Sequence, residues 1–536
     1  MANNNFPSFE GAAHGLAAGA LAPQPALPVW RASLRMALVS AAGVVAAGLM
    51  AGGLAGCADM SGIAPQASLR GAASLGLGTA AEPASAPVEA QWWRGFGDET
   101  LNGLVEQALR DSPNLRLAQA RLARAQAASD VAQAATGPQV GGQLDLTRQR
   151  YTANGAVPPP LAGAITNSGT AQLAGSWELD FFGKNRAALE AALGSARAAQ
   201  ADAQAARVLL ASQVARTYFQ LLRLNEQQAV ARRALAQREE TLRLVRDRVN
   251  AGLDTRLELR QSEGGLPEAR LQLEAVQEQM ALTRNALQAL IGQPNSDAAL
   301  VLPAQSAIKK VALAPANAVI PADLLGRRAD VAAARWRVEA SSQDVANAKT
   351  QFYPNINLVG FAGFSSIGLG QLLDAGSRQW GVGPALRLPI FESGRLRANL
   401  RGRTADLDAA VESYNMAVID AVREVADQLA SSQAIGRQQT EQQAAQEAAE
   451  SAYDIAVQRY KAGLGNYLNV LTAETSVLAQ RRLGIDLAGR ALETQVALAR
   501  ALGGGYAPEP LPVAQDASKT IAVSAGAASA KNTLDQ

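Results

Sequence analysis

The chain has 536 residues and a formal net charge of +2, from 49 Lys and Arg against 47 Asp and Glu. It contains one histidine, His14, and one cysteine, Cys57, which excludes a Cys/His zinc site, a Cys/His dyad, a Ser/His/Asp triad and an internal disulfide. The balanced charge argues against a nucleic-acid partner, and no phosphate-binding or nucleophile-elbow motif occurs. We therefore expect no catalytic residues, no bound cofactor and no metal.

The N-terminal residues 1–56 have the pattern of a signal peptide or leader. Arg31 and Arg35 precede an apolar run from Met36 to Gly53. The following tetrad, residues 54–57 (Leu-Ala-Gly-Cys), resembles a bacterial lipobox, which implies cleavage before Cys57 and attachment of diacylglycerol and an N-acyl chain such as palmitate to it. An uncleaved transmembrane helix is the alternative, because about 20 apolar residues span a bilayer. The residue after Cys57 is Ala58 and not aspartate, which at this position resembles an inner-membrane retention signal, so anchoring in the outer membrane is favoured.

Residues 57–90 and 507–536 are rich in small residues, which predicts a lipid-anchored linker and a disordered tail. Between them the chain repeats itself. Arg248-Val-Asn-Ala-Gly-Leu253 recurs as Arg459-Tyr-Lys-Ala-Gly-Leu464. These matches predict an internal two-fold repeat, with a first copy over residues 91–300 and a second over residues 301–506.

Two stretches predict unusually long helices. No proline occurs from Lys184 to Asn250 or from Gly394 to Ala462, and each stretch would be roughly 100 Å long as one helix. Within the first, apolar residues recur on a seven-residue register: Val214, Leu221, Leu235, Leu242 and Val249. An ordinary amphipathic helix explains the period but not the length, so we expect antiparallel, coiled-coil-like helix packing.

Each half also contains two segments that alternate between apolar and other residues. They predict strands at about 139–149, 170–181, 355–364 and 380–390. Strands of this length and alternation suit a transmembrane barrel, and a soluble antiparallel sheet is the alternative. Aromatic residues at or near the strands favour the membrane: Trp177, Phe181, Trp380 and Phe391.

Four strands cannot close a barrel, and each unpaired backbone group at an open edge in lipid costs several kcal/mol. Closure must then come from several copies of the chain, and three copies would supply twelve strands. The predicted fold class is mostly α with a transmembrane β-barrel: long antiparallel coiled-coil helices, four strands per protomer and a trimeric twelve-stranded barrel.

From about Trp92 to Gly505 the chain resembles the outer membrane factor (TolC-like) family, in its lipoprotein branch. The resemblance is carried by motifs in this order: Trp92-Trp93 with Phe96 and Asp98; Trp177-Glu-Leu-Asp180-Phe-Phe182-Gly183-Lys184-Asn-Arg186; Arg327-Arg328-Ala329-Asp330-Val331; Tyr353-Pro354-Asn-Ile356; Leu388-Pro389-Ile-Phe391; and Arg423-Glu424-Val425-Ala426-Asp427. It implies a homotrimer in the outer membrane whose helical tunnel extends into the periplasm. It also implies drug export without catalysis, from an inner-membrane resistance-nodulation-division pump through a periplasmic adaptor.

The same resemblance implies a periplasmic gate and an adaptor-docking site. The gate would comprise Tyr460, Leu468, Asn469 and Thr472, supplemented by Glu258, which aligns with Asn469 in the repeat. Family members commonly carry aspartate at positions matching Asn469 or Thr472, so the gate here would be neutral at those positions. On spacing alone, Leu468 fits plain coiled-coil core equally well.

The adaptor would dock on the twin Ala-Gly-Leu turns, at Gly252, Leu253, Gly463 and Leu464. These glycines would also serve as helix caps. Two other functions remain open from sequence: a type I secretion channel for proteins, and a lipid-tethered coiled-coil spacer, which would leave the alternating strands unexplained.

Overall fold

The computed structural model describes residues 60–71, 74, 88–294 and 324–506. The chain separates into two units, Met1–Asp59 and Met60–Gln536, and all described residues belong to the second. The predicted leader, Cys57, most of the linker and the C-terminal tail therefore lie outside the described residues.

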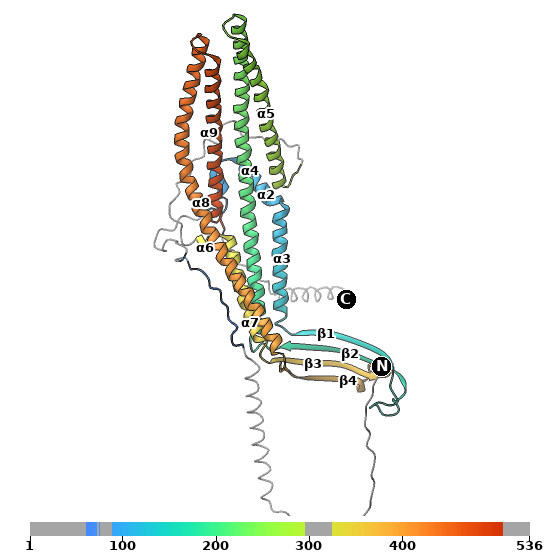
Figure 1. Cartoon of the computed structure of the whole chain (residues 1–536). Helices are drawn as coiled ribbons and strands as arrows, with labels where there is room; N and C mark the ends of the chain where they lie inside the picture. Colours follow the sequence, from blue (N-terminus) through green and yellow to red (C-terminus); the bar gives the residue numbers. More distant parts are fainter. Residues whose placement is uncertain (1–59, 72–73, 75–87, 295–323, 507–536) are drawn as a thin grey trace, which may run out of the picture. The chain divides into compact units, whose positions relative to one another are not determined.

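The helices and strands form two series of the same kinds along the chain (Figure 1). The first contains η2 (Trp92–Phe96), α2 (Glu99–Asp111), α3 (Pro113–Ala134), β1 (Gln139–Arg150), β2 (Ile165–Glu178), α4 (Lys184–Asn250) and α5 (Arg256–Leu290). The second contains α6 (Leu324–Arg327), α7 (Ala329–Thr350), β3 (Asn355–Ile367), η4 (Leu369–Gln371), η5 (Ala375–Ser377), β4 (Arg378–Arg387), α8 (Ser393–Lys461) and α9 (Tyr467–Ala501). The prediction of two very long helices is confirmed, since α4 has 67 residues and α8 has 69.

Helix α4 is the central packing element of this unit. It packs against α2, α3, α5, α7 and α9, while α8 packs against α7 and α9. The hairpins α4–α5 and α8–α9 run side by side and end in two turns, and the sheet lies at the opposite ends of α4 and α8 (Figure 1). Within the described residues, no helix has both the length and the apolar character to cross a membrane.

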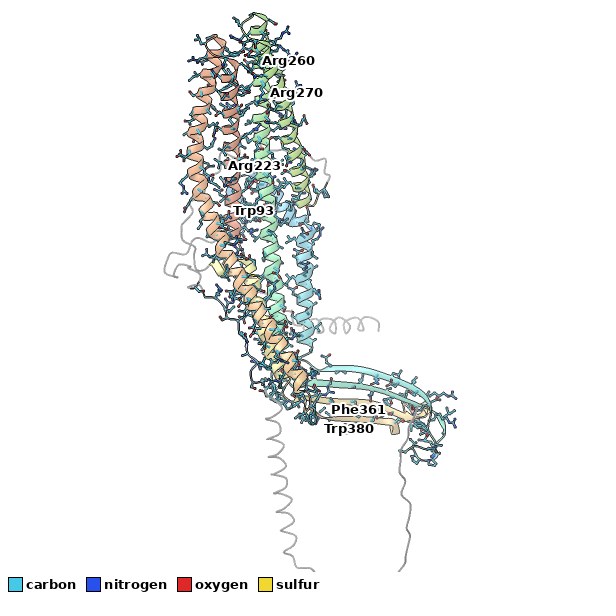
Figure 2. All side chains as sticks on the ribbon, viewed as in Figure 1. Trp93, Arg223, Arg260, Arg270, Phe361 and Trp380 are labelled. Atoms are coloured by element: carbon cyan, nitrogen blue, oxygen red, sulfur yellow. The ribbon has the colours of Figure 1, made fainter. Side chains whose placement is uncertain are left out.

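The four strands form one antiparallel sheet in the order β1-β2-β3-β4, so β1 and β4 are its edges. One face, here called the apolar face, carries exposed large side chains, and Figure 2 shows Trp380 on this sheet. They are Val140, Leu144, Leu146, Ile165, Leu173, Trp177, Leu358, Trp380, Val382 and Leu386. The opposite face carries a row of polar side chains, in which Gln172 donates to Gln143 over 3.5 Å and Gln379 donates to Gln172 over 3.2 Å.

The predicted bounds of three strands were wrong, and one of these strands, β3, continues to Ile367. Strand β2 begins at Ile165 and ends at Glu178, because Ile165 still pairs with Arg150, whereas Asp180 accepts a hydrogen bond from the Arg186 amide at the start of α4 over 2.8 Å. Strand β4 ends at Arg387, before Pro389, which has no amide hydrogen to donate to a ladder.

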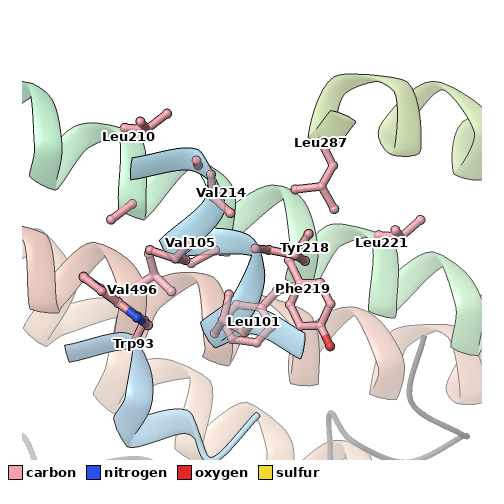
Figure 3. Close-up of a cluster of buried hydrophobic side chains, with 14 of the residues drawn as sticks. Trp93, Leu101, Val105, Leu210, Val214, Tyr218, Phe219, Leu221, Leu287 and Val496 are labelled. Carbon is pink, nitrogen blue, oxygen red and sulfur yellow. The ribbon is translucent and has the colours of Figure 1, made fainter. Parts of the chain in front are cut away.

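The tryptophan motif supplies the core where the first segment meets α4. Trp93 is buried with Leu101, Val214 and Tyr218 in a cluster that also takes in α5 and α9 (Figure 3). Asp98 caps α2 by accepting the Thr100 and Leu101 amides, and the Tyr218 hydroxyl donates to its second oxygen over 2.7 Å. The motif thus fixes the N-terminal segment against the long helices.

Two further motifs meet at a buried arginine. Arg328 forms ion pairs with Asp330 at 2.6 Å and Glu424 at 2.9 Å, and donates to the Ala501 carbonyl oxygen over 3.2 Å. Glu424 also pairs with Arg500. Burial disfavours charge on Arg328, but the hydrogen bonds and charge of Asp330 and Glu424 outweigh it and raise the arginine's pKa. This cluster joins α7, α8 and α9.

Close packing of α4 on α7 depends on Gly194. A Cβ atom there would lie 3.1 Å from the Cα and Cβ atoms of Ala340. We expect Gly194→Leu to destabilise the protein by about 1–3 kcal/mol through overpacking. Gly436→Ala, where a Cβ meets nothing within 4 Å, should be neutral or stabilising. Thermal unfolding followed by circular dichroism would check this, and equal melting temperatures for Gly194→Leu and wild type would refute it.

Candidate functional site at the helix tips

The turns α4–α5 and α8–α9 have the same backbone design. Gly252 and Gly463 adopt φ of +75° and +74°, which glycine favours. The amide of Leu253 donates to the Arg248 carbonyl over 2.8 Å, and the amide of Leu464 donates to that of Arg459 over 2.8 Å. Both turns are therefore Schellman motifs, which satisfy the last carbonyls of α4 and α8.

The turns expose leucines and leave space around both glycines. Leu253 and Leu464 are 65% and 69% exposed, and Leu257 and Leu468, on the first turns of α5 and α9, are 63% and 57% exposed. A Cβ at Gly252 or Gly463 would meet nothing within 4 Å. The predicted docking residues thus form an exposed surface of small and apolar side chains.

A three-residue contact ties the two hairpins together near their tips. Arg248 on α4 forms an ion pair with Asp254 in the α4–α5 turn, with Nε 3.0 Å from Oδ2. Its Nη1 donates to the Tyr460 carbonyl on α8 over 3.1 Å, and its guanidinium lies 4.6 Å from the centre of the Tyr460 ring. The Tyr460 hydroxyl donates to Asp254 in return. We call these residues the tip tie.

The tip tie is shielded from water, and its electrostatics favour the charged pair. Tyr460 is 1% exposed. Burial opposes ionisation of Asp254, but the hydrogen bonds from Arg248 and Tyr460 outweigh it and hold the pKa of Asp254 below its usual value. Burial and the hydrogen bond to Asp254 raise the pKa of Tyr460, which keeps its hydroxyl protonated as a donor. Arg248 and Tyr460 thus stabilise the ionised state of Asp254, and Asp254 in turn stabilises the protonated states of Arg248 and Tyr460.

A second connection lies further along the helices. Arg238 on α4 donates to the Gly265 carbonyl over 2.7 Å, and its Nη1 lies 3.0 Å from Glu268 on the same hairpin. Its Nε lies 3.6 Å from Glu474 on α9. Burial raises the pKa of Glu474, although Arg238 acts in the opposite direction. Arg238 therefore links α4, α5 and α9.

The structure distributes the predicted gate residues among different environments. Tyr460 is in the tip tie, whereas Leu468, Asn469 and Thr472 are exposed on the first turns of α9. Glu258 accepts the Thr255 amide over 3.0 Å and completes a capping box. That hydrogen bonding with Thr255 lowers the pKa of Glu258, whose carboxylate is thus engaged within its own hairpin.

Sequence reasoning missed Arg248 and Asp254 as functional candidates. Arg248 has a basic counterpart in the repeat, Arg459, so the alignment of the two copies does not single it out. The available signal was a departure from that repeat: Asp254 stands where the second copy has Gly465. Within the described residues, no group of three or more His, Cys, Asp or Glu side chains could hold a metal ion. Arg248, Asp254 and Tyr460 form a polar contact between the two hairpins.

Acidification should loosen the tip tie. Because the folded-state pKa of Asp254 lies below its ordinary value of 3.8, its stabilising effect is present above pH 3.8 and is lost as the pH falls through the lower folded value. Spin labels at Leu253 and Leu464 should show a broader distance distribution at that low pH. In the Asp254→Asn variant, the distance distribution between the two labels should already be broad at pH 7.

Glu258→Gln is the matched control for this experiment. Its carboxylate also has a lowered pKa but, among the residues described, bonds only within its own hairpin, to Thr255 and to the backbone of Glu258. This variant should keep the narrow distribution at pH 7. Equal distributions for Asp254→Asn and wild type at every pH would show that the carboxylate does not hold the hairpins together.

Comparison with known proteins is consistent with this architecture. The chain matches the family described as "Outer membrane efflux protein" over residues 104–293 and 320–504. It is 32% identical to the multidrug resistance outer membrane protein MdtQ of Escherichia coli O6:H1 over 434 residues, covering 78% of this chain and 88% of that protein. It is 38% identical to the fusaric acid resistance protein FusA of Burkholderia cepacia, covering 66% and 67%.

A solved structure extends the similarity to three dimensions. The outer membrane protein VceC of Vibrio cholerae superposes with a TM-score of 0.72 and 36% identity, covering 79% of this chain and all of that one. The family match spans more than half of the chain, in the helices and strands just described. The chain thus belongs to the outer membrane efflux protein family, and it is a non-enzymatic protein of the outer membrane.

Proposed function

We propose that the chain is the outer-membrane channel of a tripartite efflux pump, passively conducting small molecules to the cell exterior. The observation that carries this proposal is the connection of a sheet with an exposed apolar face to very long helical hairpins. An apolar face suits lipid, and the hairpins would extend the path into the periplasm. Relatives named for multidrug and fusaric acid resistance favour small organic substrates over exported proteins.

The working unit in this proposal is a homotrimer. The sheet has two edges, and in lipid their unpaired backbone groups require partners. Pairing β1 of one protomer with β4 of the next, three times, gives a closed twelve-stranded barrel. The helical hairpins of the three protomers would then line one tunnel, each protomer contributing both copies of an internal repeat.

Cys57 would anchor the chain to the outer membrane through its diacylglycerol and N-acyl groups. This part of the proposal rests on the lipobox-like tetrad that ends at Cys57. The lipid would be a covalent modification, and the channel would need no other bound group.

The turns would form the periplasmic entrance. Gly252, Leu253, Gly463 and Leu464 would receive the adaptor, which delivers substrate from a resistance-nodulation-division pump in the inner membrane. Their exposed leucines and the open space at both glycines suit an approaching apolar helix. The tip tie would keep the entrance narrow, and Leu468, Asn469 and Thr472 would line it.

Breaking the tip tie should open the channel. Hydrogen bonds to charged groups contribute about 1.5–3 kcal/mol each, so we expect Arg248→Gln to shift the balance toward the open state by about tenfold or more. Single-channel recording in planar bilayers would show this as higher conductance or open probability. Arg459→Gln is the control, because Arg459 makes a 3.3 Å bond to the Leu464 carbonyl in its own turn.

The same recordings test the lining residues. Leu468→Ala and Thr472→Ala should widen the entrance and raise conductance in the Arg248→Gln protein. If neither changes it, these residues do not line the constriction. If the Arg248→Gln protein forms no ion-conducting pore at all, the channel function itself is wrong.

A further inference from the structure

The apolar face of the sheet carries charged residues of one sign only. They are Arg148 and Arg150 on β1 and Arg378 on β4, which the alternation of the strands places with Leu144, Leu146 and Trp380. The register supports this, since Arg378 pairs with Phe364, Phe364 with Ala171, and Ala171 with Leu144. The carboxylates within the strands, Asp145 and Glu178, fall on the opposite face.

All three guanidinium groups are exposed, and among the described residues none has a hydrogen-bond or ion-pair partner. An arginine facing lipid costs about 2–4 kcal/mol at the bilayer midplane and almost nothing at the interface. Each arginine lies beyond the apolar residues of its strand, at the end away from the helices (Figure 1). Trp380 lies two residues from Arg378, as expected near an interface.

The three arginines also lie only on the edge strands. At the corresponding end of the same face, β2 carries Ile165 and Asn167 and β3 carries Ser366, all uncharged. Pairing β1 with β4 of a neighbouring protomer would place arginines from both chains on adjacent strands, about 4.8 Å apart. The charges would then gather at the seams between protomers and leave the centre of each sheet neutral.

Guanidinium groups bind phosphate through paired, charge-assisted hydrogen bonds. We propose that Arg148 and Arg150 of one protomer and Arg378 of the next form, at each seam, a site for the phosphate groups of an anionic lipid in the leaflet at the loop ends of the strands. This inference rests on the proposed trimeric barrel. The site would bind lipid across the seam where two protomers pair. There the phosphate would neutralise arginine side chains that would otherwise repel one another.

Native mass spectrometry of the whole protein in detergent tests this proposal. The probe is the bisphosphorylated glycolipid lipid A, compared with the same lipid after removal of its phosphates. The wild-type protein should appear as a trimer that retains bound lipid A. The triple variant Arg148→Gln, Arg150→Gln, Arg378→Gln should bind it at least about tenfold more weakly, since each arginine near an anionic lipid surface contributes about 1 kcal/mol.

Arg387→Gln is the matched control, because Arg387 lies at the other end of β4 and on the opposite face. It should bind lipid A as wild type does. Equal retention by wild type and the triple variant, or equal binding of the two forms of the lipid, would overturn the site. Displacement of lipid A by an equal concentration of inorganic phosphate would overturn its assignment to lipid.

The same spectra separate this inference from the proposed function. A trimer that shows no preference for the phosphorylated lipid would overturn the seam site alone and favour edge arginines that only oppose unwanted strand pairing. A protein that stays a single chain would overturn both, because a lone chain has no seam.

Discussion

The unpaired backbone at the two edges of the four-stranded sheet constrains the rest of this molecule. Strands β1 and β4 each have a neighbour on one side only. In water those free amide and carbonyl groups would be hydrated, but beside an apolar face placed in lipid they have no solvent partner. In the proposed channel, pairing with the edges of other copies would supply these partners, and the number of copies would set the width of the pore.

In the proposed channel, the helices would continue the barrel as a long conduit. Helices α4 and α8 follow β2 and β4 directly, so pairing the sheets would also align the hairpins that continue from them. Polar contacts, and not only apolar packing, connect the two hairpins of one chain: Arg248 with Tyr460, Arg238 with Glu474, and Gln227 with Asp486. Polar contacts of this kind can be exchanged for hydrogen bonds to water, which suits an entrance that opens, while the buried cluster of Val245 with Tyr460 and Val470 resists separation of the hairpins.

Much of this architecture can be predicted from the sequence, because it depends on local patterns. The two proline-free stretches predicted the long helices α4 and α8, and the two-residue alternation of apolar residues predicted the positions of all four strands. The ends of β2 were missed because they depend on pairing: Arg150 opposite Ile165 prolongs the strand, although Asn167 and Gly169 interrupt the apolar alternation. The tip tie joins residues about two hundred positions apart, and no local pattern indicates that contact. Glu258, aligned with a predicted gate residue, proved to cap its own helix.

The mass of the assembly extracted from membranes in detergent tests the central claim most directly. Light scattering corrected for bound detergent would give the number of chains per particle. Three copies of the mature chain would support a shared twelve-stranded barrel. A single chain or a pair would contradict it, because neither could supply twelve strands from sheets of four.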